Sequence, residues 1–175
     1  PEAHFGRILG ANPSPFADLN TALFEDGVVV EVAPRAVVPL PIHLLFFSTG
    51  RAPLACFPRV LVLARAASEA TLVETYVGAG TAAALTCAVT EILVEENAEL
   101  RRLKLQDETE QAFHVSTLGV RLARHGRFHD LSFSLGALLS RHDLTVTLDA
   151  EGAESSLDGL FYADGDRHTD THTLT

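Results

Sequence analysis

The hydrophobic and polar positions of the chain follow a helical pattern up to residue 27 and a strand-like pattern after it. In the segment SPFADLNTALFEDG, Ser14 suits the N-cap of a helix and Pro15 suits its first turn. Apolar side chains then recur at helical spacing, at Phe16, Leu19 and Leu23. An Asp–Gly pair at 26–27 is typical of a turn. Short, apolar, β-branched runs follow and predict strands over residues 28–32, 42–47, 59–65 and 71–77.

A repeat runs through the chain from residue 60 onward. Small-residue segments predict turns at EATL (69–72), NAEL (97–100), GRF (126–128) and GAESSL (152–157), and a strand-like run lies on each side of every turn. Alignment of Ala70, Ala98, Gly126 and Ala153 gives steps of 28, 28 and 27 residues. A fixed period of this length indicates stacked coils that pair in parallel, and therefore a parallel β-helix. The alternative is an antiparallel sandwich, which has similar short strands but predicts no fixed register.

Composition narrows the class of protein further. The chain of 175 residues is long enough for one domain, and 47% of its residues are hydrophobic, as expected of a globular core. A formal charge of −10 argues against nucleic acid or an anionic membrane as the main partner. No transmembrane run or signal peptide is visible. Two cysteines are too few for a disulfide framework, which favours the reducing cytoplasm. The chain has no methionine and begins with proline, so we expect a fragment of a longer protein.

The last twelve residues, DGDRHTDTHTLT, contain the most suggestive metal-binding pattern. His168 and His172 stand at the i, i+4 spacing that places two zinc ligands on one face of a helix. The segment THTLT, however, alternates with period two and is rich in β-branched residues, which favours a strand. Residues four apart in a strand lie about 13 Å from each other, too far to bind one ion. We therefore interpret the tail as an interrupted rung of sheet and predict no metal ligand.

Other candidate residues give weaker signals. His125 and His129 repeat the i, i+4 spacing, but the glycine between them and the predicted turn disfavour a helix. His114 lies in an alternating strand and is interpreted as a surface or a core histidine. Cys87 lies in an apolar run and is interpreted as a buried small hydrophobe. For Cys56, a loop thiol and a packed residue remain equal alternatives.

No arrangement of residues indicates catalysis. In the segment SRHD (140–143), serine, histidine and aspartate are adjacent, and a strand would point them to opposite faces. Four carboxylates near one turn are interpreted as a solvated edge: Glu91, Glu95, Glu96 and Glu99. The sequence thus predicts no enzyme, no catalytic residue and no cofactor-binding residue. The alternative is a metal-binding or carbohydrate-active β-fold enzyme, against which the absence of tryptophan and of a His-x-His pair argues.

Ordered segments of the chain resemble the core domain of SufD proteins, which are subunits of the SUF iron–sulfur cluster assembly machinery. PFADLNTALFEDGVVVEV followed by PIHLLFFSTG is similar to the start of that domain. PRVLVLARAASEATLVETYVG and LGALLSRHDLTVTLDAEGAESSLDGLFYADGDRHTDTHT continue the resemblance in order. The closing Asp170-x-His172-Thr173 resembles the family's pattern where the chain enters its next coil. The paralogue SufB shares the fold, but the LN-x-A start and LGALLSRHDL favour SufD.

The resemblance implies an all-β, right-handed parallel β-helix with a short N-terminal helix. Residues 1–175 would be one partial core domain, with 1–27 as a helical lead-in and 28–175 as coils. The implied function is a non-catalytic scaffold that acts with SufB and the ATPase SufC. The fragment itself would hold no cofactor, and iron or an iron–sulfur cluster would bind only in the full complex. An open last coil also predicts self-association near residues 155–175, because unpaired strand edges recruit further strands.

Overall fold

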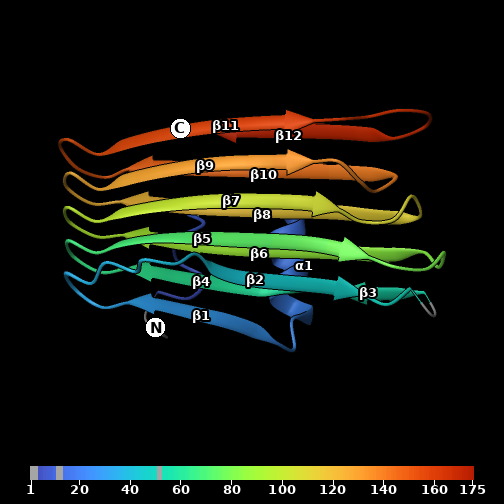
Figure 1. The fold of residues 1–175 in the computed structure, drawn as a ribbon, viewed down its shortest axis with the longest axis horizontal. Coiled ribbons are helices and arrows are strands. Elements are labelled where there is room, and N and C mark those ends of the chain that lie inside the picture. The colour runs from blue at the N-terminus through green and yellow to red at the C-terminus, as the bar shows by residue number, and fades with distance from the viewer. Residues whose placement is uncertain (1–3, 11–13, 51–52) are drawn as a thin grey trace.

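The computed structural model describes residues 4–10, 14–50 and 53–175, which form one helix and twelve strands (Figure 1). The elements are α1 Pro15–Leu23, β1 Gly27–Val32, β2 Ile42–Ser48, β3 Leu54–Cys56, β4 Arg59–Ala64, β5 Glu69–Gly78, β6 Ala84–Val94, β7 Glu99–Asp107, β8 Ala112–Leu122, β9 Arg127–Ser134, β10 Leu139–Leu148, β11 Glu154–Phe161 and β12 His168–Leu174. The helix and the four strands predicted before residue 78 are confirmed. No helix in the described ranges is long and apolar enough to cross a membrane.

The strands stack into two parallel sheets that face each other (Figure 1). Sheet A has the order β1-β4-β6-β8-β10-β12, and β3 also pairs with β6. Sheet B has the order β11-β9-β7-β5-β2. Every pairing is parallel, and from β4 onward the chain alternates between the sheets, so each coil gives one strand to each. The predicted parallel β-solenoid is confirmed, and the antiparallel sandwich is wrong.

The predicted register is correct for the later coils and wrong for the first step. Glu69 pairs with Glu99, so the residue aligned with Ala98 is Ser68 and not Ala70. That coil is therefore two residues longer than the alignment predicted. From Ala98 onward the pairing of β7 with β9 and of β9 with β11 reproduces the predicted steps. The error arose because Ala70 is a buried strand position whose small side chain resembles that of a turn residue.

The predicted turns also lie too far along the chain, because EATL and its counterparts contain the first residues of strands. The chain reverses just before them, at stacked corners whose residues have left-handed backbones: Ala67 (φ 57°), Asn97 (φ 58°), His125 (φ 53°) and Gly152 (φ 70°). Three corner amides donate to the next coil: Ala67 to the Glu96 carbonyl, Asn97 to that of Arg124 and His125 to that of Glu151. Each corner thus satisfies its backbone polar groups through its neighbour.

Helix α1 covers the outer face of sheet A through a face next to the expected one. Ser14 caps it, as predicted, and accepts a hydrogen bond from the Ala17 amide. Ala17 and Asn20 are buried, and the Asn20 amide donates to the carbonyls of Pro58 and Cys87. The apolar positions that predicted the helix remain largely exposed: Phe16 at 39%, Leu19 at 38% and Leu23 at 48%. Ala17 lies at the interface because a small side chain lets the helix pack closely against the flat sheet.

A buried ion pair fixes the N-terminal segment to the same face. Arg59 and Glu91 lie 2.6 Å apart and are almost fully buried. The Glu91 carboxylate also accepts hydrogen bonds from the Gly6 and Ile8 amides, and Arg59 donates to Asn20 of α1. The prediction that Glu91 belongs to a solvated edge is therefore wrong. A carboxylate within the apolar run of β6 is tolerated there because its charge is paired and its oxygens are hydrogen-bonded.

Candidate functional site

The interior of the solenoid is apolar next to the stacked corners and polar at the opposite end of the strands. On β5, Ala70 and Leu72 belong to the main hydrophobic cluster, whereas the next inward positions are Glu74 and Tyr76. Strands β6, β7, β8 and β10 follow the same division. The buried polar side chains of this region are Glu74, Tyr76, Thr86, Thr90, Arg102, Lys104, Gln106, Glu108, His114, Ser116, Asp130 and His142. The polar interior is the densest concentration of ionisable groups in the described residues and is the candidate functional site.

Its first component is a ladder of alternating charge across β5, β7 and β9. Arg102 donates from Nε to a Glu74 oxygen at 2.8 Å and from a terminal nitrogen to Asp130 at 2.7 Å. All three side chains are at least 98% buried. Burial alone would raise the pKa of Glu74, but the charge and hydrogen bonds of Arg102 outweigh it and hold that pKa below its usual value. Glu74 is therefore ionised and paired with Arg102, which also bonds to Asp130.

The second component places Ser116 between Lys104 and His142. The Lys104 ammonium donates to Ser116 Oγ at 2.6 Å, and that oxygen lies 2.8 Å from His142 Nδ1. Burial lowers the pKa of Lys104 to about 7, and the neighbouring Arg102 charge acts in the same direction. Burial also lowers the pKa of His142 well below its usual value, so its ring is neutral. A serine beside two bases is the arrangement of an activated nucleophile.

Burial prevents this arrangement from acting on a substrate. Lys104 is 1% exposed, His142 2% and Ser116 4%, and none of the three lines a described pocket. Ser116 Oγ instead also donates to the Arg141 carbonyl within the sheet. The group therefore contributes to the packing and electrostatics of the interior.

The third component centres on Glu108, which follows β7. Its carboxylate accepts hydrogen bonds from Thr86 Oγ1 at 2.5 Å and from the Gln106 amide at 3.2 Å, and it lies 2.7 Å from His114 Nδ1. Burial would raise the pKa of Glu108, but its contacts with His114, Thr86 and Gln106 lower it. Burial lowers the pKa of His114 to about 4. At neutral pH, Glu108 is thus ionised while the side chains in contact with it are uncharged.

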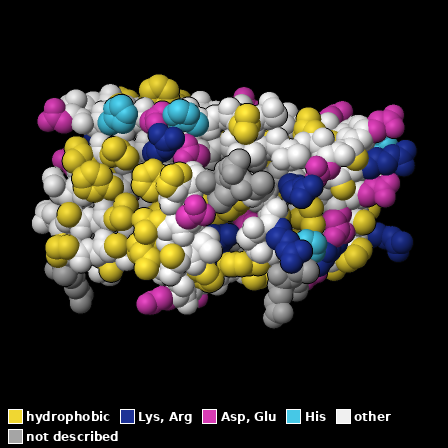
Figure 2. Space-filling model, turned by 180° about the vertical axis from the view of Figure 1, so that it is seen from behind, with side chains coloured by type: hydrophobic (Ala, Val, Ile, Leu, Met, Phe, Trp, Pro, Cys, Tyr) yellow, Lys and Arg dark blue, Asp and Glu magenta, His cyan; other side chains and the backbone are white. Residues whose placement is uncertain are grey.

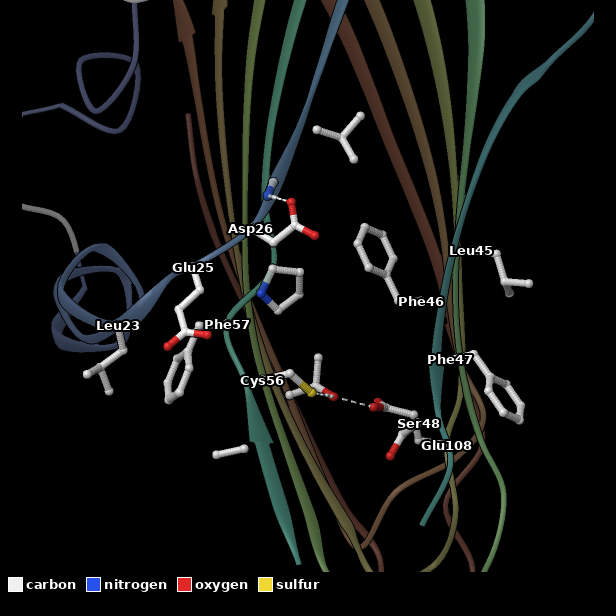
Figure 3. A pocket seen from close by; sticks show the side chains of 15 residues that line it. Leu23, Glu25, Asp26, Leu45, Phe46, Phe47, Ser48, Cys56, Phe57 and Glu108 are labelled. Atoms are coloured by element: carbon white, nitrogen blue, oxygen red, sulfur yellow. Dashed lines mark hydrogen bonds between the residues drawn. The ribbon is translucent and has the colours of Figure 1, made fainter. Parts of the chain in front are cut away.

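A pocket of about 600 Å³ connects Glu108 to the surface at the N-terminal end of the solenoid (Figure 3). It exists because β2 and β3 are end strands at this point, and no strand in the described ranges lies below them. Cys56 faces the pocket, with its sulfur 3.9 Å from Thr86 Oγ1. Burial raises the pKa of this thiol, so it is not an activated nucleophile. Cys56 is therefore a half-buried strand residue at a cavity wall.

The remaining candidate residues do not meet at one site. The tail forms strand β12, as its alternation predicted, and β12 pairs with β10 in sheet A. His168 and His172 are both exposed, and Nε2 of His172 lies 3.2 Å from Asp170. Figure 2, which shows the molecule from behind the view of Figure 1, has histidines beside acidic and basic side chains near the C-terminal end of the stack. No group of three metal-ligating side chains occurs in the ranges that the structure describes.

The isolated histidines and Cys87 have structural positions. His125 is a corner residue, whereas His129 lies within β9. His114 is fully buried, so of the two alternatives it is a core histidine and not a surface histidine. Cys87 is 1% exposed, and burial raises its pKa to about 11, in agreement with its interpretation as a small hydrophobe. In the SRHD segment, Ser140 and His142 point inward and Asp143 does not, as a strand requires.

Sequence reasoning did not identify the polar interior. In ELRRLKLQD the leucines suggest the inward face, yet the inward positions of β7 from residue 102 onward are Arg102, Lys104 and Gln106. The available signal was the repeat itself. Arg102 and Asp130 carry opposite charges and are spaced by the predicted 28 residues, which is the pattern of an internal ion pair, whereas Glu74 is in register with Lys104 because its coil is two residues longer.

The fold and its interior define a parallel β-solenoid of the kind built from stacked two-strand coils. Residues 46–175 match the family model described as "SUF system FeS cluster assembly, SufBD core domain". The chain belongs to this SufBD family.

Three curated relatives give the extent of the similarity. An iron–sulfur cluster assembly SufBD family protein of Synechocystis is 29% identical over 167 residues, which cover 90% of this chain and 37% of the relative. One of Pyrococcus horikoshii is 29% identical over 140 residues, 77% of this chain and 30% of the relative. Protein ABCI7, chloroplastic, of Arabidopsis thaliana is 32% identical over 139 residues, 75% and 29% respectively. The chain thus spans about a third of the length of these relatives.

Proposed function

We propose that the protein is a non-catalytic scaffold subunit of SufD type in iron–sulfur cluster assembly, acting in the cytoplasm with a SufB-like paralogue and the ATPase SufC. Membership of the SufBD family carries this proposal, because the family belongs to the SUF system of iron–sulfur cluster assembly. The LN-x-A start and the LGALLSRHDL segment favour the SufD type. Iron or a cluster is the cargo of the assembled complex in this proposal, and no residue of this chain is proposed as its ligand.

The last coil offers the surface that suits a protein partner. Strand β12 is the terminal strand of sheet A in the described residues, and β11 is the terminal strand of sheet B. Three large apolar side chains at the end of β11 and just after it are more than half exposed: Leu160, Phe161 and Tyr162. An edge strand with unpaired backbone groups beside apolar side chains is suited to strand addition from a partner.

The free edge can be assigned to particular amides. The His168 amide donates to the Leu138 carbonyl, on the side of β10. In a parallel strand, successive residues direct their amides to opposite sides. The amides of Thr169, Thr171 and Thr173 therefore point to the free edge, and proline at Thr171 removes one edge donor without removing a bond to β10.

Co-expression with the SufB-like paralogue and SufC of the same genome tests the proposal. We expect a complex that survives affinity purification of this chain, with SufB present in stoichiometric amount. Thr171→Pro should lose SufB, whereas the matched Thr171→Val, which retains the edge amide, should keep it. A chain that purifies alone under all conditions, or a complex that Thr171→Pro leaves intact, would contradict the docking of SufB on the last coil.

A further inference from the structure

The pocket at the N-terminal end of the solenoid has the composition of a ligand site. Its walls come from the end of α1 and the start of β1, from β2, from β3 and from the chain up to Pro58 (Figure 3). Its volume of about 600 Å³ lies within the range of small-molecule sites, which is about 300–1,000 Å³. Most of the side chains that line it are apolar, with a few polar groups between them. This mixture fixes the orientation of a ligand as well as binding it.

The charge of the lining is entirely negative. Glu25, Asp26 and Glu108 line the pocket, and none of the 15 described residues around it is lysine or arginine. Glu108 is 6% exposed, and the side chains in contact with its carboxylate are the uncharged Thr86, Gln106 and His114. These contacts stabilise the carboxylate but supply no positive charge to pair with it. A cationic group in the pocket would supply that charge.

A hydrogen-bond acceptor and an aromatic face lie close to the same carboxylate. Ser48 Oγ is buried and has no hydrogen-bond partner among the described residues, and Figure 3 shows its side chain beside that of Glu108. Phe46 lines the pocket and stacks on the buried Tyr76 with ring centroids 4.6 Å apart, so its ring is held in place. Aromatic faces bind ammonium groups favourably when water is excluded.

We propose that this pocket binds a small primary alkylammonium compound. The ammonium group donates to the Glu108 carboxylate, whose charge is otherwise unpaired, and to Ser48 Oγ, which has no other partner among the described residues, and the alkyl body packs against Phe46. A neutral or anionic ligand of the same shape would leave the Glu108 charge uncompensated. The proposal concerns the opposite end of the solenoid from the last coil and does not depend on the scaffold function.

Calorimetric titration with n-hexylammonium tests the ligand class, with hexan-1-ol and hexanoate as matched probes of equal chain length. We expect saturable binding of hexylammonium that is at least about tenfold tighter than that of either control, because only the cation compensates a buried charge. Equal binding of the three compounds, or none of hexylammonium, would overturn the proposal. A blocked lysine, N-acetyl-lysine methylamide, serves as a further probe. Binding of this probe that is tighter than that of hexylammonium would support an ammonium-binding site. It would also show that the ammonium group comes from a lysine side chain, and the proposal of a free amine would be wrong.

Variants locate the site. Glu108→Gln should weaken hexylammonium binding by about tenfold or more, whereas Glu151→Gln, at an exposed corner, should leave it unchanged. Cys56→Trp fills the pocket from a half-buried wall position that faces it and should abolish binding with an unchanged unfolding midpoint. Saturating hexylammonium should also slow alkylation of Cys56 by iodoacetamide. If Cys56→Trp binds normally and Cys56 of the parent is not protected, the ligand lies elsewhere and the proposal is wrong.

Discussion

Lys104 is the residue whose environment conflicts most strongly with its chemistry. Its ammonium is removed from water, and the hydrogen-bond acceptor it reaches is the uncharged Ser116. The Tyr76 ring, 5.6 Å from its nitrogen, is a weakly favourable contact, but burial and the like charge of Arg102 outweigh it. Because these costs fall on the charged form, protonation of Lys104 opposes folding.

The sign of the resulting pH dependence follows from the two pKa values. Lys104 has a pKa of about 7 in the folded chain and an ordinary value of 10.5 when unfolded. Between these values the unfolded chain binds more protons, so stability rises with pH. We expect the free energy of unfolding, relative to that of Lys104→Met, to increase between pH 7 and pH 10 by an amount on the order of a few kcal/mol. Urea unfolding of the parent and of Lys104→Met across this pH range measures the difference. A difference in the free energy of unfolding that does not change with pH would contradict the lowered pKa of Lys104.

Arg102 differs from Lys104 because its charge supports folding by pairing with two buried carboxylates. Arg102→Met would leave Glu74 and Asp130 without their cation, and we expect a loss of about 3–5 kcal/mol in the free energy of unfolding. The triple variant Glu74→Gln, Arg102→Met, Asp130→Asn removes all three charges and should recover a large part of that loss. Chemical denaturation compares them. A single variant within about 1 kcal/mol of the parent would show that the ladder contributes little.

At the scale of elements, the corners determine how one coil follows the next. Gly152 combines a left-handed backbone with a close contact, because a Cβ added there would lie 2.0 Å from His125 Nδ1 of the preceding corner. Gly165 has a similar backbone, with φ of 58°, but a Cβ there would meet nothing within 4 Å. Substitution of Gly165 therefore tests backbone strain alone, whereas substitution of Gly152 tests backbone strain together with steric contact.

Alanine substitutions use this difference. Gly165→Ala should cost about 1 kcal/mol through backbone strain alone. Gly152→Ala should cost about 1–3 kcal/mol more, because the His125 ring must move. In the double variant with His125→Ala, that additional cost should disappear. Thermal unfolding of the three variants tests the reasoning, and equal effects of the two glycine substitutions would be incompatible with a contact at the corner.

The elements illustrate what a sequence pattern can specify. The strands were predictable because β-branched runs alternate with breaks at a nearly constant period, as in LTVTLDAEGAESSL. The corner positions were not, because Ala67 and His125 adopt left-handed backbones that their side chains do not favour and that cross-coil hydrogen bonds stabilise. The charged interior was hidden for a related reason. Arg102 looks like a surface residue until Glu74 and Asp130 are placed beside it in adjacent coils.

At the scale of the whole molecule, each coil contacts mainly its neighbours, and among the described residues the unpaired strands lie at the two ends of the stack. We expect the chain to associate with itself through residues 155–175, because β11 and β12 combine free edges with exposed apolar side chains. Multi-angle light scattering should show a concentration-dependent rise in mass for the parent and for Thr171→Val. Thr171→Pro should remain monomeric. A strict monomer at high concentration for all three would contradict this prediction.

The parallel stacking of the coils also makes the molecule directional, so its two ends present different surfaces. Contact between unlike ends would repeat without limit and produce a filament. Contact between two copies of the last coil has a twofold axis, which runs the two β12 strands antiparallel and occupies both edges at once. Association through β12 therefore closes on itself at two copies, and growth is self-limiting.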